Sequence, residues 1–158
     1  MARQPIRVYA DTSVYGGVFD SEFARANLAF FEQVGQSLLH LVSSALVANE
    51  LRGAPQRVRD FAAWFLAHAE EARVSPECLA LGNAYLAEGI VSPASMTDAL
   101  QVAVATVARC DIIVSWNFAH IVNFQRIPRY NAVNALCGYR PIRIHSPLEM
   151  VRYEEEGI

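Results

Sequence analysis

The 158-residue sequence contains no lysine, so all 13 of its basic side chains are arginine. This absence excludes chemistry that requires a lysine, including phosphate binding by a P-loop and catalysis through a Schiff base. Cysteine is also scarce, with no C-x-x-C motif and three widely spaced residues: Cys78, Cys110 and Cys137. That pattern predicts neither a disulfide framework nor a zinc site. Arginine does favour bidentate binding of phosphates and carboxylates.

Long apolar runs are missing as well. No segment approaches the roughly 20 residues that cross a bilayer, and the first residues, MARQPIRVYAD, lack the apolar stretch and cleavage site of a signal peptide. We therefore expect a cytoplasmic protein that does not associate with a membrane. The formal net charge of -3 argues mildly against nucleic-acid binding by overall charge, although local arginine clusters still permit it.

The residues that are present are largely apolar, at 53% by number. We expect a single domain over residues 1–158 that ends in an acidic tail at about 153–158. Short strand-like runs alternate with segments of helical spacing. The expected strands are 6–10, 38–44, 111–117 and 140–146, and the expected helices are 21–36, 45–53, 57–71, 76–89 and 95–110. This order predicts an α/β fold, an open and mainly parallel sheet of four to five strands with helices on both faces.

The first strand runs directly into an acid, Asp11, in the segment IRVYADTSVYGG. In open parallel sheets, ligands bind outside the carboxyl ends of the strands, which is where this side chain is expected. A strand-end aspartate can also close a turn or cap the next helix. Both interpretations remain open for Asp11 on these grounds.

Glu50 is expected on the helix of residues 45–53. Helical spacing places it on the face of Leu46 and Val47, on or beside an apolar stripe. A partly buried glutamate needs a partner, which could be a cation or a nearby arginine. We therefore consider a functional role and a salt bridge to Arg52 or Arg57 as equal alternatives.

Asp98 follows Ser95 by three residues and lies in the first turn of the most apolar helix. The simplest role for an acid there is to stabilise the helix start, with Ser95 as the N-cap. An acid at the start of a buried helix is also fixed near the expected crevice of the sheet. The structural and functional interpretations of Asp98 are therefore compatible.

Asn117 ends the third expected strand in IIVSWNFAHI, much as Asp11 ends the first. Its amide oxygen could be a neutral ligand for a hard cation, and the neighbouring Ser115 offers a hydroxyl. The alternative is that Asn117 is an ordinary turn residue. His120 in the same segment could touch a substrate, although we favour a structural or surface role for it.

Together these segments resemble the successive motifs of the PIN-domain family, in particular the VapC-like toxins of bacterial toxin–antitoxin pairs. The motifs are VYADTSV, SSALVANEL, MTDALQVAVA and IIVSWNFAHI, followed by GYRPIRIHSPLEMV as a typical closing strand and short helix. The resemblance covers most of the chain in the expected order. It implies that Asp11, Glu50 and Asp98 occupy the places of the family's first three acids. Asn117 stands where the family often has a further acid, which implies a weaker second metal position.

The resemblance implies a Mg²⁺- or Mn²⁺-dependent endoribonuclease that hydrolyses RNA phosphodiester bonds, as the toxin of a toxin–antitoxin pair. It implies an antitoxin protein as partner, and a homodimer. Asp11, Glu50 and Asp98 would be the catalytic, metal-binding acids, because hard oxygen ligands without histidine or cysteine favour these cations. We expect Thr12 and Ser13 to hydrogen-bond the carboxylates and fix their geometry.

Two other functions remain as alternatives. A phosphatase of the haloacid-dehalogenase type also has an aspartate after its first strand, but it needs a second aspartate at position 13 and a later lysine. Position 13 is serine here and lysine is absent. A PIN-like module that binds a metal or a protein without turnover is the stronger alternative.

Arginines form two groups along the chain. The first is Arg52, Arg57 and Arg59, and the second is Arg126, Arg129, Arg140 and Arg143. A solvated surface explains either group. A group that borders the crevice could instead bind RNA phosphates and offset the overall acidity.

Overall fold

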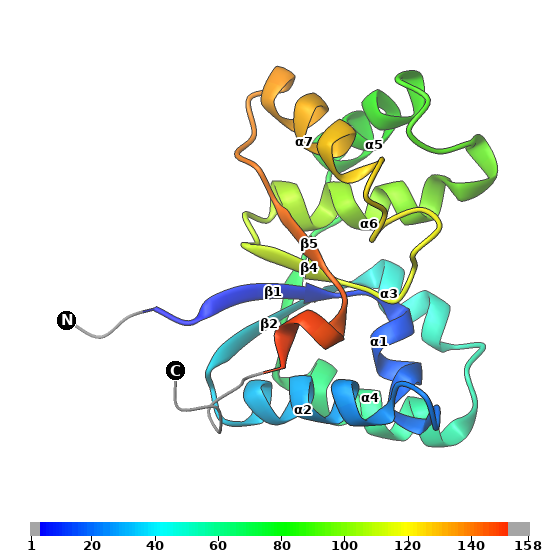
Figure 1. The fold of residues 1–158 in the computed structure, drawn as a ribbon, viewed down its shortest axis with the longest axis vertical. Coiled ribbons are helices and arrows are strands. Elements are labelled where there is room, and N and C mark those ends of the chain that lie inside the picture. The colour runs from blue at the N-terminus through cyan, green and yellow to red at the C-terminus, as the bar shows by residue number, and fades with distance from the viewer. Residues whose placement is uncertain (1–3, 152–158) are drawn as a thin grey trace.

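The computed structural model describes residues 4–151 and contains a five-stranded sheet in the order β3-β2-β1-β4-β5, with every neighbouring pair parallel (Figure 1). The predicted acidic tail lies outside the described residues. The strands are β1 (Ile6–Ala10), β2 (Leu39–Ser44), β3 (Glu70–Ala72), β4 (Ile112–Val114) and β5 (Arg143–His145). The predicted α/β class and the parallel sheet are confirmed.

Helices cover both faces of this sheet. In Figure 1, α5, α6 and α7 lie on one side of it, and α1, α2 and α4 lie on the other. The helices are α1 (Thr12–Gly16), α2 (Ala24–Gly35), α3 (Ala45–Leu51), α4 (Gln56–His68), α5 (Pro76–Ala87), α6 (Met96–Val107) and α7 (Ile127–Leu136). Three 3₁₀ turns accompany them, at Gly17–Phe19, Pro93–Ser95 and Pro147–Met150. Within residues 4–151, none of these helices has the length and apolarity to cross a membrane.

Strand β1 lies at the centre of the sheet and of the core. Val8 pairs with Leu41 of β2 on one side and with Ile112 of β4 on the other. Val8, Tyr9 and Ala10 have no exposed surface. Because both faces of the sheet are covered, consecutive residues of this strand are buried, which explains its continuous apolar sequence.

Some predicted boundaries were wrong. The segment 57–71 is not one helix, because α4 ends at His68 and Glu70–Ala72 forms β3 against β2. The helix predicted from Ser21 begins at Ala24, and its N-cap residue is Phe23, without a side-chain cap. Asp20 instead closes the preceding turn by accepting a hydrogen bond from the backbone N–H of Glu22 (2.8 Å). Helix α7 was not predicted.

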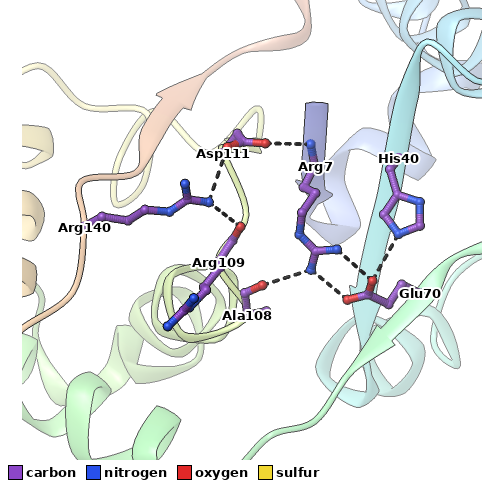
Figure 2. Close-up of polar contacts among 7 residues, drawn as sticks. All are labelled: Arg7, His40, Glu70, Ala108, Arg109, Asp111 and Arg140. Atoms are coloured by element: carbon purple, nitrogen blue, oxygen red, sulfur yellow. Dashed lines mark hydrogen bonds and ion pairs between the residues drawn. The ribbon is translucent and has the colours of Figure 1, made fainter. Parts of the chain in front are cut away.

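A polar network joins the amino ends of the strands (Figure 2), at the edge of the sheet opposite the carboxyl ends, where Asp11 follows β1. The Arg7 guanidinium donates two hydrogen bonds of 2.7 Å to the Glu70 carboxylate and one of 2.9 Å to the carbonyl of Ala108. His40 Nε2 lies 3.1 Å from the same carboxylate. The contact with Arg7 lowers the pKa of Glu70 to about 2. Arg7 thereby connects β1 to the edge strand β3 and to the end of α6.

Arg140 completes this network from the segment before β5. It donates to the carbonyl of Arg109 (2.7 Å) and to the carboxylate of Asp111 (3.3 Å), which also accepts from the backbone N–H of Arg7 (2.9 Å). Arg140 and Arg7 therefore satisfy carbonyl groups left without partners at the carboxyl end of α6, where cations are favoured. This is a structural role for one member of the second arginine group.

Candidate active site

Asp11 lies directly after β1 and is the N-cap of α1, with 6% of its surface exposed. Its backbone N–H donates to the carbonyl of Val114 in β4 (3.1 Å). One carboxylate oxygen accepts from the backbone N–H of Ser13 (3.1 Å) and from its hydroxyl (2.5 Å), and the other accepts from the hydroxyl of Ser115 (2.6 Å). Asp11 therefore caps a helix, as one interpretation held, and is also fixed at the carboxyl edge of the sheet.

The two serine hydroxyls have defined orientations. Ser13 Oγ accepts from the backbone N–H of Trp116 (2.9 Å), and Ser115 Oγ accepts from that of Asn117 (2.9 Å). Because each oxygen accepts from the backbone, each hydroxyl proton is available to donate to Asp11. This arrangement ties the ends of β1 and β4 together around a single carboxylate.

The carboxylate of Asp11 has an unusual electrostatic environment. Burial raises its pKa to about 6, the hydrogen bonds from Ser115 and Ser13 oppose that rise, and the negative charge of Glu50 adds to it. Within residues 4–151, no arginine or histidine forms an ion pair with Asp11. The described part of the chain therefore leaves this buried negative charge without a cationic partner.

Glu50 lies in the last turn of α3 and is exposed, so its expected place on an apolar stripe was wrong. The salt bridge to Arg52 or Arg57, which was one of the two alternatives for Glu50, is also absent from the described residues. Its carboxylate instead accepts a hydrogen bond of 2.8 Å from the side-chain amide of Gln101 in α6. The negative charge of Glu50 contributes to the raised pKa of Asp11, although burial is the larger cause.

Asp98 lies in the first turn of α6 and is half-buried. Because α6 leads into β4, which is parallel to β1, the helix starts at the same sheet edge that Asp11 occupies. Ser95 holds the N-cap position, but the capping role predicted for its side chain was wrong: its Oγ lies 3.2 Å from His120 Nε2. After burial itself, the charge of Asp98 is the largest cause that raises the pKa of Tyr130.

Within the described residues, the three acids do not form a preformed metal-binding site. Within residues 4–151, no three acidic, histidine or cysteine side chains lie together in a group that could hold one metal ion. The charge of Glu50 raises the pKa of Asp11, and the charge of Asp98 raises that of Tyr130. Mg²⁺ commonly binds through one or two carboxylates and retains several waters, so the donor set of Asp11 and Glu50 fits it chemically. The uncompensated charge of Asp11 also favours a cation there.

The remaining predicted residues divide into two kinds. Ser13 hydrogen-bonds Asp11 as expected, and Ser115 does so too, whereas the expectation for Thr12 was wrong, because its buried hydroxyl has no partner among the described residues. The amide oxygen of Asn117 accepts from the backbone N–H of His120 (3.0 Å), which is the geometry of a turn residue. Asn117 therefore shapes the loop after β4 in this structure.

Sequence reasoning missed Gln101 and Tyr9. Gln101 is a polar residue in the most apolar helix, three positions after Asp98, and it is 2% exposed. Tyr9 has a hydroxyl in a fully buried strand and donates it to the Gln101 side chain. A glutamine within an apolar helical run was a signal that could have found this site, because a buried amide requires partners.

The two arginine groups have different surroundings. Arg126 donates to the carbonyl of Ile90 (2.9 Å) and Arg129 to that of Glu88 (2.6 Å), so both satisfy carbonyl groups just beyond α5. The first group, Arg52, Arg57 and Arg59, is exposed on and beside α3 and α4. The guanidinium of Arg57 lies over the ring of Phe19, 5.2 Å from its centre.

Comparison with known proteins identifies the fold. No protein-family model and no curated protein sequence matches the chain. Among solved structures, it is similar to a chain of VapBC2 from Rickettsia felis bound to a DNA fragment from their promoter, with 14% identity and a TM-score of 0.61 over 89% of this chain and 98% of that chain. It is also similar to Mycobacterium tuberculosis VapC20, a toxin that cleaves the sarcin-ricin loop, with 16% identity and a TM-score of 0.51 over 86% and 98%.

At these identities the likeness defines the fold. The chain has the PIN-like α/β fold of VapC structures, with its parallel sheet covered by helices on both faces. The resemblance that the sequence motifs indicated is confirmed at this level.

Proposed function

We propose that this protein is a Mg²⁺- or Mn²⁺-dependent endoribonuclease and the toxin of a toxin–antitoxin pair. The observation that carries the proposal is the buried carboxylate of Asp11, which has no cationic partner in the described chain and is coupled to Glu50 at the carboxyl edge of a VapC-like fold. The described RNA-cleaving activity of VapC20 supports the choice of reaction.

In this proposal, Asp11 and Glu50 would hold the metal ion. Asp98, at the start of α6, would be a further carboxylate ligand. When bound, the metal ion would lower the pKa of a water molecule and neutralise charge on the reacting phosphodiester. Ser13 and Ser115 hold the Asp11 carboxylate in one orientation, so that it is fixed before the substrate arrives. A protein nucleophile is not needed.

The first arginine group supplies a surface for the RNA backbone. Arg52 follows Glu50 by two residues. Arg57 lies over Phe19, which is three residues after the end of α1, the helix that Asp11 caps. These exposed guanidinium groups can bind phosphates next to the acids although the whole chain is acidic. The cleaved RNA would therefore cross α3 and the start of α4.

The proposed partners follow from the similar proteins. The Rickettsia felis structure is a VapBC2 assembly on promoter DNA, which supports a cognate antitoxin protein for this chain. We also propose a homodimer and a cytoplasmic location, where both RNA and an antitoxin would be available.

A cleavage assay tests the proposal. Purified protein is incubated with a panel of structured and single-stranded RNAs in Mg²⁺ or Mn²⁺, and RNA ends are sequenced. We expect defined new ends that disappear with a chelator and return when the metal ion is restored. Intact RNA throughout would contradict the proposal and would favour the PIN-like binding module without turnover.

A further inference from the structure

A chain of buried hydrogen bonds leads from the start of α3 to Glu50. Tyr9 in β1 has no exposed surface, Ser44 is 3% exposed and Gln101 in α6 is 2% exposed. The Tyr9 hydroxyl lies 2.7 Å from Ser44 Oγ and donates to Gln101 Oε1, and Gln101 Nε2 donates to Glu50 (2.8 Å). The chain therefore ends on an exposed carboxylate that is electrostatically coupled to Asp11.

The direction of every bond in this chain follows from Glu50. An ionised carboxylate only accepts, so the Gln101 amide must present its NH₂ group to Glu50 and its oxygen to Tyr9. The Tyr9 hydroxyl then gives its one proton to Gln101 and accepts from Ser44. Ser44 Oγ in turn accepts the backbone N–H of Leu46, as the N-cap of α3 (3.3 Å). No member of the chain has a competing orientation.

This network joins the elements that carry the proposed acids. Ser44 caps α3, which carries Glu50, and Gln101 lies three residues after Asp98 on α6. The bond between Gln101 and Glu50 therefore fixes the end of α3 against the helix that carries Asp98. Two apolar side chains could fill the buried positions of Tyr9 and Gln101 without any polar group to satisfy. A purely structural role does not require the network to end on an exposed carboxylate.

We propose that Gln101 is a positioning residue that holds the Glu50 carboxylate in place for metal binding, and that Tyr9 holds Gln101. The inference rests on the proposed function for the identity of the metal ion. Its geometric part, the ordering of Glu50, stands independently of metal binding.

Two variants test the positioning role. Gln101→Met keeps a similar volume and removes both bonds, and Tyr9→Phe removes only the hydroxyl. Thr106→Val is the matched control, because the Thr106 hydroxyl is also buried in α6 but donates to the carbonyl of Val102 (2.8 Å) and accepts from Asn134 (3.5 Å) instead of contacting Glu50. Unfolding midpoints of all three identify any general loss of stability.

The first measurement is the order of the Glu50 side chain, from NMR relaxation of its methylene groups in metal-free protein. We expect an ordered side chain in the wild type and in Thr106→Val, and a mobile one in Gln101→Met. Equal order in the wild type and in Gln101→Met would overturn the proposal whether or not the protein binds metal.

The second measurement is Mn²⁺ affinity, from the free-ion EPR signal. Groups that orient metal ligands typically change affinity by about 10- to 100-fold when removed, so we expect about tenfold weaker binding in Gln101→Met and a smaller loss in Tyr9→Phe. In a Glu50→Ala background, Gln101→Met should have no further effect. Affinity that Glu50→Ala reduces and Gln101→Met leaves unchanged would overturn the proposal. A wild type that binds no Mn²⁺ would overturn the proposed function instead, and the Glu50 order would decide the positioning role.

Discussion

At the scale of single residues, the account depends on the charge of Asp11. Burial opposes ionisation of this carboxyl, and three donors from two serines only partly compensate. Glu50 adds a second negative charge nearby. A protein that keeps such a pair at the edge of its sheet is destabilised by it in the absence of a cation, which is typical of a functional site.

The first prediction concerns this destabilisation. Folded Asp11 has a pKa of about 6 against an ordinary 3.8, so between these values the folded protein binds more protons than the unfolded chain. Ionisation of Asp11 therefore lowers the free energy of unfolding as pH rises from 3.8 to about 6. In metal-free buffer, we expect Asp11→Asn to be more stable than the wild type above pH 7, by up to about 3 kcal/mol, and equally stable below about pH 4.

Urea unfolding of both proteins across pH, in the presence of a chelator, measures this difference. Because asparagine resembles the protonated acid, its advantage should grow only where the wild-type carboxyl ionises. A constant difference between the two proteins across the range would show that the charge of Asp11 is already balanced within the fold.

At the scale of elements, the edge strand β3 is the least expected feature. Its first two residues are Glu70 and Glu71, and both are exposed. Two side chains engage Glu70 in this strand: His40 from the neighbouring strand β2, and Arg7 from β1, one strand further into the sheet (Figure 2). Charged residues on a short edge strand also discourage pairing with other chains.

The second prediction concerns Glu70→Gln. The folded pKa of Glu70, about 2, lies below its ordinary value of 4.5, so its stabilising contribution is present above pH 4.5 and is lost as pH falls towards 2. The side chain is 42% exposed, so solvent screening limits the loss at pH 7 to about 1 kcal/mol. Denaturant unfolding should show this loss at pH 7 and none near pH 2. The neighbouring Glu71→Gln is the control, and an equal loss from it would remove the role assigned to Glu70.

Local sequence predicted the elements whose signal is local. The apolar run of β1, the acid that ends it and the parallel sheet follow from residue order. Strand β3 could not be predicted in this way, because its contacts are with β2 and with Arg7, which lies 63 residues before Glu70 in the chain. Ser95 likewise matches the sequence pattern of an N-cap residue, but its hydroxyl contacts the ring of His120, 25 residues later.

The candidate site was predictable to a similar degree. The motifs singled out Asp11, Glu50 and Asp98 as candidates, and Ser13 was correctly expected to hydrogen-bond a carboxylate, whereas the same expectation for Thr12 was wrong. The exposure of Glu50 and its bond to Gln101, 51 residues away, depend on how α3 meets α6. No spacing within one segment carries that information.

At the scale of the whole molecule, the described surface retains large exposed apolar side chains. Phe124, just before α7, is 91% exposed, and Leu136 at the end of α7 is 83% exposed. These two side chains bracket α7, which makes the surface of this helix our candidate for an association interface. It is consistent with the homodimer that the family resemblance implies.

The third prediction follows from these residues. We expect light scattering to give the mass of a dimer, and we expect Phe124→Ser and Leu136→Ser to weaken the dimer more than Leu28→Ser, an exposed apolar residue on α2. The physical reason is the loss of apolar area buried on association. A monomer at all concentrations, or equal effects of the three substitutions, would contradict this prediction.

The most direct test of the proposed function is the single-turnover rate of RNA cleavage in Mn²⁺ by the wild type, Asp11→Asn and Glu32→Gln. Glu32 is an exposed glutamate on α2 that accepts a hydrogen bond from Gln36, so it controls for the loss of one negative charge away from the proposed RNA surface. We predict that Asp11→Asn remains folded and loses at least about 100-fold in rate, because a misplaced metal ion also misplaces its water, while Glu32→Gln cleaves like the wild type. Equal cleavage by all three proteins would contradict the assignment of Asp11 to the active site.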